Sequence, residues 1–116
     1  MGSYVAFKDF ILALNPELRV DISAQTSKDC GNLYPVFTGL VKDLPSSVMK
    51  SISELSVFDV YNTVYALGEN DANRGHYGFG YIAVNVELNI CIGPVSECMA
   101  ERLEKEWRER RDKNDN

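Results

Sequence analysis

Hydrophobic and polar residues alternate along positions 78–92, which is the pattern of a strand with two different faces. One side of this strand is apolar, with Ile82, Val84, Val86, Leu88 and Ile90. The other side carries Phe79, Tyr81, Ala83, Asn85, Glu87 and Asn89. We predict that the first side faces the core and that the second side is a surface able to recognise a ligand.

Three other stretches have the apolar spacing of amphipathic helices. An N-terminal helix is predicted from Phe7, Phe10, Ile11 and Leu14, with Ser3 as a capping residue and Asn15-Pro16 as its end. A short middle helix over Ser46–Ile52 directs Val48, Met49 and Ile52 inward. A longer charged helix begins at about Glu97, with Ser96 as its N-cap and Met99, Leu103 and Trp107 on its buried stripe.

Three further strands complete the pattern. They are expected at 18–24, at 33–41, where Pro35 indicates an edge or a strand end, and at 55–67, with Phe58, Val60 and Val64 on one side and Val57, Tyr61, Thr63 and Tyr65 on the other. The strands at 55–67 and 78–92 should form an antiparallel ribbon that ends at Gly93-Pro94. The fold predicted is α+β: one domain over 1–116, an antiparallel sheet of about four strands and three helices, with residues 113–116 as a disordered tail.

Composition narrows the function classes. The chain has 116 residues, of which 45% are hydrophobic, enough for the core of a single domain. Its formal net charge of −5 opposes bulk binding to nucleic acid or to anionic membranes. No apolar run is long enough to span a bilayer, and the odd number of cysteines fits a reduced compartment. We therefore expect a cytoplasmic protein.

No pattern in the chain indicates catalysis. His76 is the only histidine, and it stands in a glycine-rich stretch without a neighbouring serine or cysteine. Cys91, Cys98 and Cys30 do not have the spacing of zinc ligands, and we interpret the first two as small buried apolar residues. The glycines at 75–80 precede a strand, whereas phosphate-binding glycine loops precede a helix. We predict a protein that is not an enzyme and has no catalytic residue, metal or cofactor.

Residues suited to a planar anionic ligand do occur together. Such a ligand needs aromatic rings for stacking, amides for polar edges and guanidinium groups for phosphate. The predicted ligand-binding residues are Phe79, Tyr81, Asn85, Asn89, Arg74, Arg108 and Arg111. Arg111 lies four residues after Trp107, and so continues the buried stripe of the last helix. The alternative interpretation is that the rings are cross-strand packing partners and the arginines belong to a solvated face with i,i+4 ion pairs, such as Glu104–Arg108.

A family resemblance adds to this interpretation. The runs FKDFILALNPELRVDIS, VFTGLVKDLPSSVMKSI and SVFDVYNTVYAL, within residues 7–67, resemble small accessory proteins of phages and prophages in Gram-positive bacteria. Among these, the chain is similar to Thoeris anti-defence sponges in having Phe79 and Asn89 on one strand face and Arg108 and Arg111 on the last helix. The resemblance implies an oligomer that captures a cyclic nucleotide signal.

Two functions follow as expectations. The first is a non-enzymatic anti-defence protein that sequesters a small nucleotide-derived ligand. The second is an acidic inhibitor, comparable to an anti-CRISPR protein, that binds a basic groove on a host defence nuclease complex. In both cases we expect a homo-oligomer, because a small domain gains buried surface by pairing.

Overall fold

The computed structural model describes residues 5–26, 32–66 and 84–114, with the side chains of 63–66, 84–86 and 114 left out. Its elements are α1 (Phe7–Leu12), β1 (Arg19–Gln25), β2 (Leu33–Leu40), the 3₁₀ turn η1 (Val41–Asp43), α2 (Ser46–Ile52), β3 (Ser56–Ala66), β4 (Val84–Gly93) and α4 (Glu97–Asn114). The four strands and three α-helices of the described residues, in this order, confirm the predicted α+β class.

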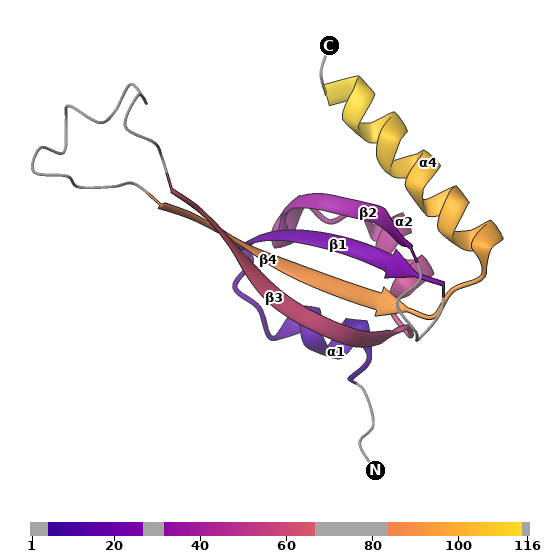
Figure 1. The fold of residues 1–116 in the computed structure, drawn as a ribbon, viewed down its shortest axis with the longest axis horizontal. Coiled ribbons are helices and arrows are strands. Elements are labelled where there is room, and N and C mark those ends of the chain that lie inside the picture. Colours follow the sequence, from indigo (N-terminus) through magenta and orange to yellow (C-terminus); the bar gives the residue numbers. More distant parts are fainter. Residues whose placement is uncertain (1–4, 27–31, 67–83, 115–116) are drawn as a thin grey trace, which may run out of the picture.

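The sheet has the strand order β2-β1-β4-β3, so that β1 and β4 lie at its centre (Figure 1). The β1–β2 and β3–β4 pairs are antiparallel, but β1 and β4 are parallel, with Val20 opposite Leu88 and Ile22 opposite Ile90. The prediction of a wholly antiparallel sheet was therefore wrong in this one pairing. The cause is the connection through α2, which crosses from β2 at one edge of the sheet to β3 at the other, so that both edge strands run in the same direction. Each edge strand is antiparallel to its inner neighbour, and β1 and β4 are therefore parallel to each other.

One face of the sheet forms the core. Val20, Ile22 and Ala24 of β1 and Ile90 and Ile92 of β4 are completely buried there. The three α-helices contribute to the same cluster through Phe7, Ile11, Val48, Ile52, Ala100 and Leu103. The helices thus cover the face with even-numbered β1 and β4 residues, and the opposite face carries Glu87 and Asn89, the two members of the predicted polar set whose side chains are described.

The assignment of β3 residues to the two faces of the strand differs from the prediction. A bulge between Val57 and Asp59 places an extra residue, Phe58, in the strand. Val57 lies opposite Ile92 and Val60 lies opposite Ile90, so both belong to the core side, whereas alternation alone placed them on opposite sides. Beyond the bulge, β3 and β4 continue past β1 as a two-stranded ribbon, as Figure 1 shows.

Several predicted boundaries are confirmed. The middle helix has the predicted bounds, β4 ends at Gly93, and the Ser96 hydroxyl accepts a hydrogen bond from the Met99 amide at 3.1 Å as the N-cap of α4. Pro35 lies in an edge strand beside a bulge in β2. The first helix is shorter than expected, with Ala6 as its N-cap and Leu12 as its last residue, and Ser3 lies outside the described residues. In the described part of the chain, no helix has both the length and the apolar character needed to cross a membrane.

Candidate functional site

A groove of about 360 Å³ opens between the end of β2 and the C-terminal half of α4. Its described lining residues are Phe37, Thr38, Gly39, Asp43, Pro45, Trp107, Arg110 and Arg111. The set combines aromatic rings, two guanidinium groups and one carboxylate. It is the candidate site, and we refer to it below as the β2–α4 groove.

Trp107 is positioned by the packing of α4 on the core. Ala100 and Leu103 on this helix are almost completely buried, and Trp107 follows Leu103 by four residues, so it lies one turn further along the same stripe. Its indole Nε1 donates a hydrogen bond of 3.3 Å to the Thr38 hydroxyl of β2. The indole therefore bridges the helix and the edge strand, and its ring forms part of the groove wall.

Arg111 lies against this ring. Its guanidinium carbon is 4.8 Å from the centre of the Trp107 ring, which is a cation–π arrangement. The Arg111 side chain remains 51% exposed, and Arg111 Nε is 3.8 Å from a carboxylate oxygen of Asp112. The stacking holds one face of the guanidinium against Trp107, while the exposed part of the side chain can receive an anion from solvent.

Arg110 adds a second positive charge to the groove. Its guanidinium donates a hydrogen bond to the backbone carbonyl of Val36 in β2. Burial lowers the pKa of Arg110 from its usual value, and the nearby Glu106 carboxylate acts in the opposite direction. Because arginine titrates so far above neutral pH, the group stays charged. A guanidinium has five donors, so donors remain for a ligand after this backbone contact.

The far wall of the groove is formed by η1 and the residues after it. The Val41 amide donates to the Leu18 carbonyl at 2.9 Å, and the Lys42 amide donates to the Pro16 carbonyl at 3.0 Å. These bonds fix η1 to the segment that leads into β1. The Asp43 carboxylate is thereby held at the groove, where it can accept hydrogen bonds from a ligand's N–H or O–H groups.

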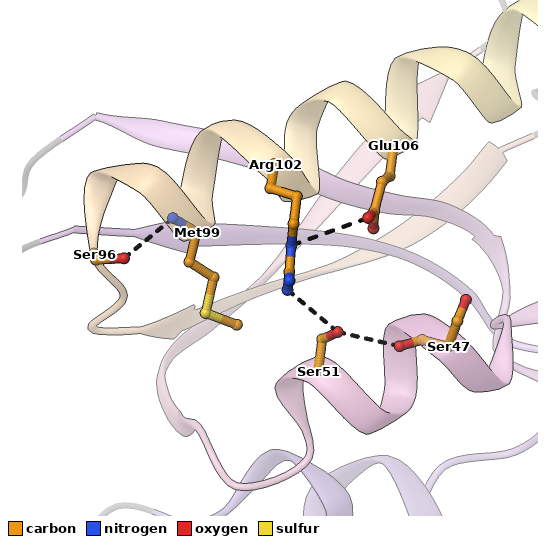
Figure 2. Close-up of polar contacts among 6 residues, drawn as sticks. All are labelled: Ser47, Ser51, Ser96, Met99, Arg102 and Glu106. Atoms are coloured by element: carbon orange, nitrogen blue, oxygen red, sulfur yellow. Dashed lines mark hydrogen bonds and ion pairs between the residues drawn. The ribbon is translucent and has the colours of Figure 1, made fainter.

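A second groove, of about 320 Å³, lies between α2 and α4. Arg102 on α4 donates to the Ser51 hydroxyl of α2 at 3.5 Å and lies 4.0 Å from Glu106, while Ser51 donates to the Ser47 carbonyl (Figure 2). Its described charged residues are Arg102, Glu106, Glu109, Arg110 and Lys113, so it carries both acidic and basic groups. It has no aromatic lining among the described residues, and we interpret it as a polar contact between two helices.

The sheet face opposite the helices is acidic. Asp21, Asn89 and Tyr61 lie side by side across β1, β4 and β3, with Ser23, Cys91 and Asp59 in the next row. Burial raises the pKa of Asp21, and the nearby Glu87 carboxylate adds to the effect. Arg19 Nε is 3.4 Å from a Glu87 carboxylate oxygen. Three carboxylates against the one guanidinium of Arg19 give the described part of this face a net negative charge, which disfavours an anionic ligand.

The structure separates the predicted site residues. Arg111 lines the β2–α4 groove, whereas Arg108 is paired with Glu104 and is not among the described lining residues. Asn89 is 91% buried on the acidic face, where its amide donates to the Tyr61 carbonyl at 3.4 Å. Asn85 pairs with Tyr65 in the β3–β4 ribbon. The predictions for Phe79, Tyr81 and Arg74 fall outside the described residues.

The sequence pattern missed part of the groove. Thr38, Asp43 and Phe37 come from segments that look like an ordinary strand and turn, and no spacing links them to the last helix. The signal that pointed to the groove is the i,i+4 spacing of Trp107 and Arg111, whose side chains are in contact there, although Arg111 is exposed and does not extend the buried stripe.

The cysteines follow the prediction only in part. Cys91 is 94% buried, and burial raises the pKa of its thiol, with the Asp59 and Asp21 carboxylates acting in the same direction. Cys98 is exposed, so the prediction that it is buried was wrong: it lies in the first turn of α4 on the side away from the core. Within residues 5–26, 32–66 and 84–114, no group of three or more His, Cys, Asp or Glu side chains is placed to hold a metal ion.

Comparisons with known proteins give no relative: no family model, no curated protein and no solved structure matches this chain.

Proposed function

We propose that the protein binds a small anionic ligand with a planar group, of the nucleotide class, in the β2–α4 groove. The observation that supports this is the stacking of the Arg111 guanidinium on Trp107 beside a second guanidinium, Arg110. Guanidinium groups bind phosphate oxygens through charge-assisted hydrogen bonds, and exposed ring and guanidinium planes stack on bases. A volume of about 360 Å³ is within the range of small-molecule sites.

Binding without turnover is the mechanism that we propose. The hydroxyl in the described lining, that of Thr38, accepts a hydrogen bond from the Trp107 indole, and the rings and guanidinium groups around it are suited to holding a ligand. A protein that only binds a nucleotide signal lowers its free concentration. This is the sequestration role implied by the resemblance to Thoeris anti-defence proteins, and it remains part of the proposal.

The test is a calorimetric titration with cyclic dinucleotides, cyclic trinucleotides and cyclic ADP-ribose isomers, with inorganic phosphate as a control for the anion alone. Arg111→Gln removes the stacked guanidinium and its charge and leaves a shorter, neutral and polar side chain. A hydrogen bond to a charged group contributes about 1.5–3 kcal/mol, so the variant should bind at least about tenfold more weakly.

Arg108→Gln is the matched control. Arg108 lies on the same helix and is also exposed, but it pairs with Glu104 and is absent from the described groove lining. Its substitution should leave affinity unchanged. Equal losses in both variants, or binding that Arg111→Gln does not weaken, would rule out the groove as the site.

The acidic sheet face favours a second candidate function. Asp21, Asp59 and Glu87 lie on one face of a chain whose net charge is −5, and such a surface complements a basic groove on a nuclease complex. This proposal predicts an association with purified host nuclease complexes that weakens as salt rises. Asp59→Lys should weaken that association, whereas Glu101→Lys on the exposed side of α4 should not. An association that does not depend on salt would contradict it.

A further inference from the structure

Arg110 lines both of the grooves described above, the β2–α4 groove and the one between α2 and α4, which we call the α2–α4 groove. Successive residues of a helix are about 100° apart around its axis. Trp107 and Arg111 therefore lie about 60–100° to one side of Arg110, and Glu106 and Lys113 lie about 40–60° to its other side. Arg110 thus stands at the boundary between two grooves that adjoin each other.

The facing wall also passes from one groove to the other. Pro45, the N-cap of α2, lines the β2–α4 groove, and Ser47, two residues later, lines the α2–α4 groove. The two grooves are thus neighbours on both walls. A ligand that fills the first groove and extends past the Arg110 guanidinium enters the second.

The two grooves differ in chemistry. The β2–α4 groove has the indole of Trp107, which suits a planar group. The described lining of the α2–α4 groove has no ring, and it carries the hydroxyls of Ser47 and Ser51 and the carboxylates of Glu106 and Glu109. Hydroxyl and carboxylate oxygens accept hydrogen bonds from the hydroxyls of a sugar. The second groove therefore suits a hydroxylated group that is not planar.

Cations of α4 line the passage between the grooves. Arg110 uses one of its five N–H donors on the Val36 carbonyl. Arg102 contacts the Ser51 hydroxyl at 3.5 Å and the Glu106 carboxylate at 4.0 Å, yet its side chain remains 55% exposed and can contact a ligand. The described linings together hold four basic and three acidic side chains, so this region is positive in a chain whose net charge is −5.

Resting on the proposed function of the β2–α4 groove, we propose that the ligand extends through both grooves, with a planar base against Trp107 and Arg111 and a phosphate at Arg110. A second sugar then lies in the α2–α4 groove beside Arg102. The ligand class is a nucleotide whose phosphate joins the nucleoside to a further sugar. The volumes of about 360 and 320 Å³ together lie within the range of small-molecule sites, and a nucleoside monophosphate leaves the second groove empty.

Calorimetric titration with short and long ligands of the same base tests how far the site extends. The short probes are AMP and GMP, and the long probes are ADP-ribose, cyclic di-AMP and cyclic di-GMP. At least one long probe should bind at least about tenfold more tightly than the monophosphate of its base, because it gains a further hydrogen bond to a charged group.

Arg102→Gln tests the second groove separately. It should weaken binding of the long probe by at least about tenfold and leave binding of the monophosphate unchanged, whereas Arg111→Gln should weaken both. Arg108→Gln is the matched control. Arg108, like Arg102, is about half exposed and pairs with a glutamate one turn away, but it is absent from both described linings. Its substitution should change neither affinity.

The outcomes separate this inference from the proposed function. A monophosphate that binds as tightly as its long counterpart, or a long probe that Arg102→Gln does not weaken, overturns the two-groove ligand and leaves the β2–α4 groove as the site. If no probe binds, the proposed function fails and this inference fails with it. If circular dichroism shows that Arg102→Gln does not fold, Lys113→Gln replaces it with the same expectation, and Lys105→Gln is its control.

Discussion

The substitution Gly93→Ala tests the junction between β4 and α4. Gly93 has φ +148°, a backbone conformation that L residues rarely adopt, and a Cβ atom there would lie 2.5 Å from the carbonyl oxygen of Gln25. That oxygen also accepts a hydrogen bond of 3.1 Å from the Val95 amide. Relief of the clash requires the backbone of β1 or β4 to move, and this movement disturbs the Val95 bond.

The cost can be estimated from these two effects. An unfavourable φ/ψ region costs about 1–3 kcal/mol, and loss of a backbone hydrogen bond costs about 0.5–1.5 kcal/mol. Alanine also restricts the unfolded chain, which returns about 0.4–1 kcal/mol. We therefore expect Gly93→Ala to lower the free energy of unfolding by about 1–4 kcal/mol, a large fraction of the stability of a small domain.

Gly39→Ala is the matched control. Gly39 has φ +147°, almost the same conformation, but a Cβ atom there would meet only the Phe37 ring, at 3.1 Å. The two variants share the conformational strain and the unfolded-state effect, and only Gly93→Ala has the backbone clash. Urea denaturation followed by circular dichroism should give the lower midpoint for Gly93→Ala. If Gly39→Ala is equally or more destabilised, the reasoning about the Gln25 carbonyl is refuted.

Three further outcomes are expected from denaturation experiments. Leu103→Ala should destabilise the protein by about 2–5 kcal/mol, because the side chain is 99% buried, and a loss below this range would contradict its place in the core. Ser96→Ala should cost about 1 kcal/mol through loss of the α4 N-cap, whereas Ser96→Asp should retain stability. The pKa of Asp21 is raised in the folded state, so ionisation of this carboxyl disfavours folding. The destabilisation is absent below the ordinary pKa of aspartate, and it grows as pH rises from there through the raised pKa of the folded state. Asp21→Asn should therefore stabilise the protein at pH 7, by less than about 1 kcal/mol, and not at pH 3; equal effects at both values would contradict the assignment.

Local patterns predicted most of the elements because the residues that determine them are neighbours in the chain. The apolar spacing in Ser46–Ile52 and the Ser96 cap depend on contacts within one or two turns, and both are confirmed. The edge position of the second strand followed from one property of Pro35, its missing N–H.

Features that depend on distant segments were not predictable in this way. The parallel direction of β4 relative to β1 results from the α2 crossover, and the alternation of residues within one strand carries no information about such a connection. The bulge at Phe58 placed Val57 and Val60 on the same face of β3 instead of on opposite faces, since one extra residue exchanges the two sides beyond it. The groove joins Thr38 and Asp43 to Trp107 across most of the chain, so only its helical half, through the Trp107–Arg111 spacing, was visible in the sequence.

The parallel pairing of β1 with β4 also determines how the chain folds. The β1–β2 pair joins strands that are close in sequence, whereas Val20 meets Leu88 only after most of the chain has been ordered. Contacts between distant residues slow folding, because the entropy of closing the intervening chain is lost before the contacts form. We expect this central pairing to form late. Until it does, β1 and β4 each expose an apolar strand edge, so slow refolding and aggregation should have the same origin.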